Sequence, residues 1–101
     1  MIHVLASITV RKGCLVEFLD IFKANIPAVL GEKGCVEYIP AIDVNSSLPS
    51  QKVDENIVTI IEKWQCLEHL QTHLTAPHML VYREKVAALV EKVSMKVLEN
   101  A

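Results

Sequence analysis

No segment of the 101-residue sequence has the character of a membrane anchor or a secretion signal. The apolar runs fall short of the roughly 20 residues that a membrane-spanning helix needs. The first ten residues, MIHVLASITV, lack the basic start and the cleavage site of a signal peptide. We therefore expect a cytoplasmic protein that does not act in a membrane.

The sequence also lacks an excess of charge of one sign. It has 10 Lys and Arg against 12 Asp and Glu, and the two signs are interspersed. Without a basic stripe to hold phosphates, nucleic acid is not an expected partner. The cysteines Cys14, Cys35 and Cys66 are odd in number and have no paired spacing, so we expect free thiols in a reducing compartment. No nucleophilic triad, phosphate loop or dinucleotide fingerprint is present.

Apolar residues, by contrast, are plentiful. They make up 51% of the chain, and the mean hydropathy is +0.32. The length predicts one domain over residues 1–101, and a domain of this size has much surface to cover. The excess of apolar area indicates a subunit interface or an apolar pocket.

The spacing of the apolar residues predicts an α+β fold. Residues 2–10 and 57–64 alternate as strands do, whereas residues 14–30 carry a helical stripe that stops at Gly31 and Gly34. The other predicted elements are a strand over 35–42, a loop over 43–56, a short helix over 65–74, a helix from Pro77 to about Val90 with Thr75 as its cap, and a strand over 94–98. The order β-α-β-β-α-β is that of a ferredoxin-like antiparallel sheet with helices on one face.

The face of the predicted sheet that has no helices also carries apolar side chains, such as Leu5 and Ile61. Such a face needs a cover, and a second copy of the chain is the simplest one. The sequence therefore predicts a homodimer.

Three of the four histidines lie in the segment HLQTHLTAPHM, residues 69–79. On a helix, Cys66, His69 and His73 would share one side, as a set of metal ligands does. The segment lacks the glutamate of H-E-x-x-H, and the chain has no paired C-x-x-C. We therefore expect no metal site here.

The predicted short helix separates these histidines. Its core stripe leaves His69 in solvent and His73 at the border of the buried face, since the stripe consists of Leu67, Leu70 and Leu74. His78 begins the next helix and shares a face with Tyr82, four residues later. It could cap the helix, pack on the tyrosine ring or act in a pocket.

Four further residues fit either a structural or a functional role. Trp64 is suited to core packing or to a flat pocket wall for an aromatic ligand. Glu62 shares the strand face of Trp64, and an inward carboxylate needs a partner, such as a salt bridge across a dimer interface. Tyr38 fits an interface or a pocket, and Arg83 fits a solvated helix border or a pocket.

Several segments of the sequence resemble the antibiotic-biosynthesis monooxygenase family. The matching pieces are VLASITVRKG, GCVEY and IVTIIEKW followed by LEHLQTHLTAPHM, within a match from residue 2 to about residue 98. The loop 43–56 and the segment IPAVLGEKGC look most like the bacterial quinol monooxygenases. The resemblance implies a dimeric α+β barrel in which two sheets face each other. It also implies oxidation of a phenolic or hydroquinone substrate by O₂ without flavin, haem or metal.

The haem-degrading branch of that family carries an Asn, Trp and His set. These positions fall on Ala6, His73 and Arg83 in this sequence, and all three differ. The resemblance therefore argues against haem degradation.

A base, an oxyanion partner and an apolar pocket are what quinol oxidation needs, because a deprotonated quinol reduces O₂ by itself. Histidine titrates near neutral pH and suits the base. We expect His73 as the base with His78 as the alternative, and a substrate pocket formed by Trp64, Tyr82, Arg83, Tyr38 and Glu62. Two other interpretations stay open: an isomerase or binding protein of the same fold, and a dimer without a catalytic role.

Overall fold

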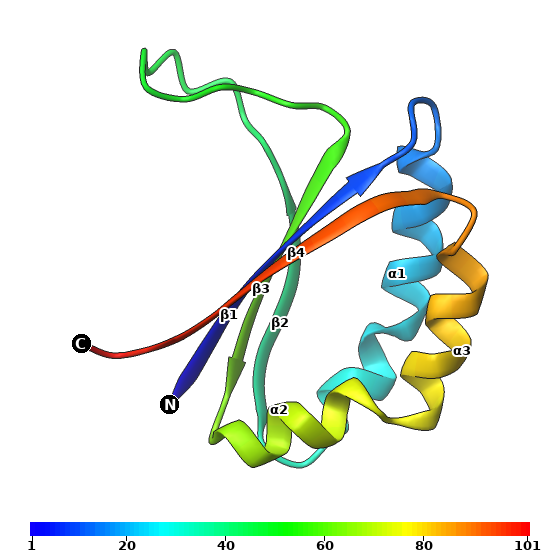
Figure 1. Ribbon diagram of the computed structural model, residues 1–101, viewed down its shortest axis with the longest axis vertical. Coiled ribbons are helices and arrows are strands. Elements are labelled where there is room, and N and C mark those ends of the chain that lie inside the picture. The colour runs from blue at the N-terminus through cyan, green and yellow to red at the C-terminus, as the bar shows by residue number, and fades with distance from the viewer.

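The computed structural model describes residues 1–101 and consists of a sheet and a layer of helices on one of its faces (Figure 1). In chain order the elements are β1 (Ile2–Val10), α1 (Leu15–Leu30), β2 (Cys35–Ile42), β3 (Ile57–Trp64), α2 (Leu67–Leu74), α3 (Pro77–Val86) and β4 (Val90–Glu99). The sheet has the strand order β2-β3-β1-β4, and all its pairs are antiparallel. The predicted α+β class and ferredoxin-like antiparallel sheet are confirmed.

Alternation along the two central strands builds the core. Ala6 on β1 lies opposite Ile60 on β3, so each sends its side chain to the same face as its partner. That face meets the stripe of α1, where Phe18 and Phe22 are buried. The core is completed by Val4, Ile8, Val10, Val29, Tyr38, Val58, Trp64, Leu70, Met79, Tyr82, Val86 and Leu89.

The end of α3 and the start of β4 differ from the prediction. The predicted helix to about Val90 ends at Val86, and the final strand begins at Val90 rather than at residue 94. The Leu89 N–H donates to the Val86 carbonyl at 2.8 Å, and the Arg11 N–H donates to the Leu89 carbonyl at 2.8 Å, so the chain turns here. The segment AALV contains no glycine or proline to mark this turn. Thr75 ends α2 instead of capping α3, whose N-cap is Ala76.

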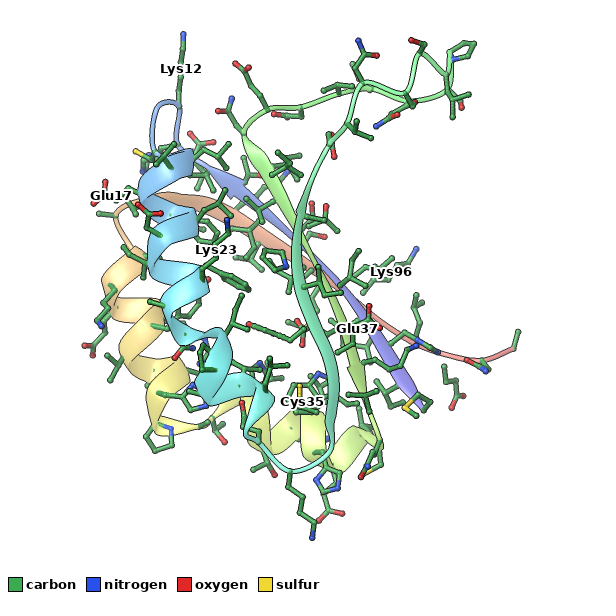
Figure 2. The ribbon with its side chains drawn as sticks, turned by 180° about the vertical axis from the view of Figure 1, so that it is seen from behind. Lys12, Glu17, Lys23, Cys35, Glu37 and Lys96 are labelled. Carbon is green, nitrogen blue, oxygen red and sulfur yellow. The ribbon has the colours of Figure 1, made fainter.

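The opposite face of the sheet carries no helix. Leu5, Ile39 and Ile61 lie side by side on it and are 42%, 44% and 38% exposed. Glu37 and Lys96 point away from the helices on the same face (Figure 2). We call this surface, centred on Leu5, Ile39 and Ile61, the open face.

The loop at residues 43–56, as predicted, contains neither helix nor strand. It projects from the end of the sheet (Figure 1), and almost all of its residues are exposed. No helix of the structure is both long enough and apolar enough to cross a membrane.

Candidate functional site

A cavity of about 300 Å³ lies between the helices and the sheet. Of its 16 lining residues 13 are hydrophobic, and the others are Glu62, His73 and Arg83. Each helix and each of the strands β1, β2 and β3 contributes a buried residue to the lining, whereas Val93 and Met95 of β4 are 58% and 43% exposed. The helix layer therefore leaves the cavity open along β4.

Aromatic rings form one wall of the cavity. Phe22 stacks on Tyr38 with ring centroids 5.3 Å apart, and Tyr82 meets Phe22 edge-on at 5.8 Å. Tyr38 also contacts the His73 ring edge-on at 5.5 Å. The rings of Phe22, Tyr38 and Tyr82 therefore border an apolar space with His73 beside them.

His73 is the buried polar group of α2. Its Nδ1 donates a hydrogen bond to Glu32 Oε2 at 2.7 Å, and its ring lies 4.7 Å from the Trp64 ring. Burial lowers the pKa of His73, while the hydrogen bond to Glu32 and the charge of that carboxylate raise it, and His78 and Arg83 lower it. A pKa below its ordinary value keeps the imidazole neutral at pH 7, as a general base requires.

The burial of His73 corrects the expected orientation of α2. The apolar stripe predicts that Leu67 is buried and that His73 lies at the border, but Leu67 is 48% exposed and His73 is buried. The helix is turned toward His73 because the bond to Glu32 satisfies the imidazole, which removes the main cost of burying it. The same rotation of α2 brings His69 to a half-buried position against Gly34, whereas the sequence predicts it in solvent.

Glu62 is the second buried polar group. Its Oε1 accepts a hydrogen bond from Trp64 Nε1 at 3.0 Å. Burial raises the pKa of Glu62 to about 7; the bond from Trp64 opposes this, and the charge of Glu32 adds to it. Near neutral pH the carboxyl is therefore present both as an acid that donates a hydrogen bond and as a carboxylate.

The two tyrosine hydroxyls at the cavity are held in the protonated form. Burial raises the pKa of Tyr38, and the charge of Glu62 raises it further. Burial also raises the pKa of Tyr82, although Arg83 lowers it in part. Both hydroxyls are therefore hydrogen-bond donors at physiological pH.

The structure brings together five of the seven residues expected at the site: Tyr38, Glu62, His73, Tyr82 and Arg83 all line the cavity. Trp64 does not, because its fully buried ring lies against His73 and holds Glu62, so it supports the pocket rather than forming a wall. His78 lies in a second hollow, of about 290 Å³, that contains residues of α1 and α3 and borders Tyr82.

Glu32 is the site residue that the sequence did not indicate. It lies in the turn after α1, and its Oε2 contacts both His73 and His78. Helical or strand periodicity gives no signal for a turn residue, and the histidine it binds is 41 positions away. The helical set of Cys66, His69 and His73 is not assembled, since the structure contains no group of three or more His, Cys, Asp or Glu placed to hold a metal ion.

Comparisons with known proteins agree with this architecture. Residues 1–85 match the family described as "Antibiotic biosynthesis monooxygenase". The Escherichia coli (strain K12) protein named "Probable quinol monooxygenase YgiN" is 34% identical over 101 residues, which cover 98% of this chain and 97% of that protein. Among solved structures, a conserved protein of Methanosarcina mazei Go1 has a TM-score of 0.85 at 20% identity, covering 99% of this chain and 92% of that one. Rv0793 of Mycobacterium tuberculosis has a TM-score of 0.82 at 23% identity, covering 99% and 94%.

Proposed function

The chain belongs to the antibiotic biosynthesis monooxygenase family, and we propose that it oxidises a quinol or another phenolic aromatic with O₂ in the cavity between helices and sheet. The observation that carries this proposal is a neutral, buried imidazole at the edge of an apolar, aromatic-walled space. The Escherichia coli relative that bears a quinol monooxygenase name supports the same substrate class.

The cavity suits a flat apolar substrate with few polar groups. Its volume of about 300 Å³ is at the lower end of the range of roughly 300–1,000 Å³ for small-molecule sites. The rings of Phe22, Tyr38 and Tyr82 offer stacking and edge contacts to an aromatic ring. We infer a small aromatic nucleus that enters along β4, where the cavity is open.

In this proposal His73 starts the reaction by taking the proton of a phenolic hydroxyl. The resulting anion is the better electron donor, and it transfers its electrons to O₂ within the apolar cavity. A substrate AH₂ and O₂ give AO and water, so one oxygen atom enters the substrate and the other leaves as water. The substrate supplies all the electrons, and no added reductant or bound cofactor is required.

In this proposal three residues that line the cavity hold the developing negative oxygen. Arg83 contributes a positive charge at the cavity, and the hydroxyl of Tyr82 and the protonated form of Glu62 are hydrogen-bond donors. Donors fixed before the reaction stabilise charge most strongly in an apolar site. The same groups orient the substrate oxygen toward His73.

O₂ uptake with menadiol and a small panel of other quinols tests the proposal. The wild-type protein should consume O₂ equally with and without a chelator, and His73→Ala should lower kcat by about 100-fold or more, because a positioned base contributes roughly 10²–10⁴-fold. His3→Ala is the matched control, since His3 is a histidine of β1 whose ring bonds Asn100 and does not line the cavity.

Wild-type rates in both His73→Ala and His78→Ala would overturn the assignment of the base. A quinol that raises the melting temperature without O₂ uptake would indicate a binding protein or an isomerase of the same fold.

We also propose that the chain works as a homodimer in the cytoplasm. The apolar side chains of the open face support this, because a water-exposed sheet face with Leu5, Ile39 and Ile61 at its centre is stabilised when a second sheet covers it. The family resemblance points to the same face-to-face arrangement.

A further inference from the structure

We propose that Glu32 is the positioning residue of the base: it fixes His73 in the tautomer whose free nitrogen faces the cavity, and His78 approaches the same carboxylate oxygen. This inference rests on the proposed function of His73 and names a residue that acts on it. The three side chains come from the turn after α1, from α2 and from the start of α3. Glu32 Oε2 lies 2.7 Å from His73 Nδ1 and 3.2 Å from His78 Nε2.

The chemistry of a carboxylate decides the tautomer of His73. An ionised carboxylate only accepts hydrogen bonds, so the bond at 2.7 Å requires the proton to be on Nδ1. The remaining nitrogen, Nε2, then carries the lone pair, and it makes no hydrogen bond within the protein. Because His73 lines the cavity, Nε2 is the atom available to a substrate proton.

The same carboxylate stabilises the product of the proton transfer. When Nε2 takes a proton, the ring becomes a cation whose Nδ1–H still points at Glu32. A negative charge at hydrogen-bond distance in a buried site favours that cation far more than it would in water. Glu32 therefore assists the transfer without touching the substrate.

His78 has a weaker share in this arrangement. Its Nε2 lies within ion-pair distance of Glu32 but makes no hydrogen bond to it. Its side chain is 27% exposed, against 14% for Glu32 and 2% for His73. His78 is thus the least buried of the three residues, although its two ring nitrogens are themselves buried and make no hydrogen bond.

The titratable and charged groups around His73 set its pH response. They are Glu32 from the turn after α1, Tyr38 from β2, Glu62 from β3, and His78, Tyr82 and Arg83 from α3. Burial lowers the pKa of His73, and Glu32 is the group that raises it. Removal of that charge should therefore lower the pKa of His73 further.

Glu32→Gln and Glu32→Asp in the full chain test the proposal. Nitrogen-15 NMR of the substrate-free protein should show His73 protonated at Nδ1, and its pKa should fall in Glu32→Gln. With menadiol, the acidic limb of the kcat profile should move to lower pH and kcat should fall at least about tenfold, part of the roughly 10²–10⁴-fold that a positioned base contributes, with KM nearly unchanged. Glu17→Gln, at an exposed position of α1 outside the cavity, is the control and should leave His73 unaffected.

Comparison of the two Glu32 variants separates electrostatic positioning from shape. Gln keeps the size of Glu and Asp keeps its charge, so the proposal expects the His73 pKa in Glu32→Asp to be closer to wild type than in Glu32→Gln. The reverse order, or a wild-type His73 protonated at Nε2, would overturn it. The NMR measurements need no turnover, so they decide the role of Glu32 even if no quinol is oxidised and the proposed function fails.

Discussion

Glu62 shows how one buried residue can serve the site at a cost to the fold. The sequence suggested a salt bridge for it, yet its partner is the indole N–H of Trp64 and its carboxyl lines the cavity. One neutral donor offsets little of the desolvation of a charge. This is why burial raises the pKa of Glu62 to about 7.

The raised pKa makes stability depend on pH in a defined direction. The folded protein holds the Glu62 proton up to about pH 7, whereas an unperturbed carboxyl loses it near 4.5. Between these values the native state binds more protons, so the free energy of unfolding should fall as pH rises, by roughly 3 kcal/mol in total. Glu62→Gln can still accept the hydrogen bond from Trp64, but it has no carboxyl to titrate. Its free energy of unfolding should therefore not fall in this way as pH rises.

Urea unfolding of both proteins at pH 4.5 and pH 8 measures the effect. The difference in free energy of unfolding between Glu62→Gln and wild type should increase in favour of the variant by roughly 3 kcal/mol from pH 4.5 to pH 8. Glu17→Gln is a matched control at an exposed position of α1. Equal pH dependence in wild type and Glu62→Gln would contradict the assignment.

At the scale of elements, α2 is held against the turn after α1 by a close approach at Gly34. Gly34 has a φ of +83°, and a Cβ at this position would lie 2.3 Å from Cδ2 of His69. The carbonyl of Gly34 also accepts a hydrogen bond from the Gln65 N–H at 2.8 Å. Since the same turn carries Glu32 and α2 carries His73, this packing sets the distance between the base and its carboxylate.

Gly34→Ala should therefore lower both stability and activity. The left-handed backbone alone costs a non-glycine residue about 1–2 kcal/mol, and the clash with His69 adds to it, so we expect a loss of more than about 2 kcal/mol in urea unfolding. Gly13→Ala is the control, because Gly13 has a φ of +84° but nothing within 4 Å of the added Cβ. Equal losses in the two variants would show that the contact with His69 carries no energy.

The sequence predicted those elements whose pattern is local. Alternation in β1 and β3 gave both strands with their bounds, and it gave the inward face of Glu62 and Trp64. It failed at Ala87 to Val90, where apolar residues suit a helix and a strand equally and no breaker intervenes. The hydrogen bond between Glu32 and His73 could not be predicted from the sequence, because it joins distant segments and depends on how α2 is rotated.

At the scale of the whole molecule, the open face leads to a prediction about assembly. Light scattering after size-exclusion chromatography should give the mass of two chains. Ile61→Lys should shift the protein to single chains. A buried unpaired charge costs on the order of 3–5 kcal/mol, which raises the Kd of the dimer by more than about 100-fold. Leu80→Lys on α3, also at an exposed apolar position, is the control and should leave the mass unchanged. A wild-type protein of single-chain mass would contradict the proposed homodimer.

The strand order β2-β3-β1-β4 also decides when the sheet can form as the chain is synthesised. β1 is made first, yet both of its neighbours, β3 and β4, belong to the second half of the chain. β1 and β2 do not pair with each other, so the first 56 residues contain no strand pair of this sheet. The apolar β1 can therefore pair along one edge only after residues 57–64 have been made, and along its second edge only after residues 90–99. Until then it is available to bind chaperones or to aggregate.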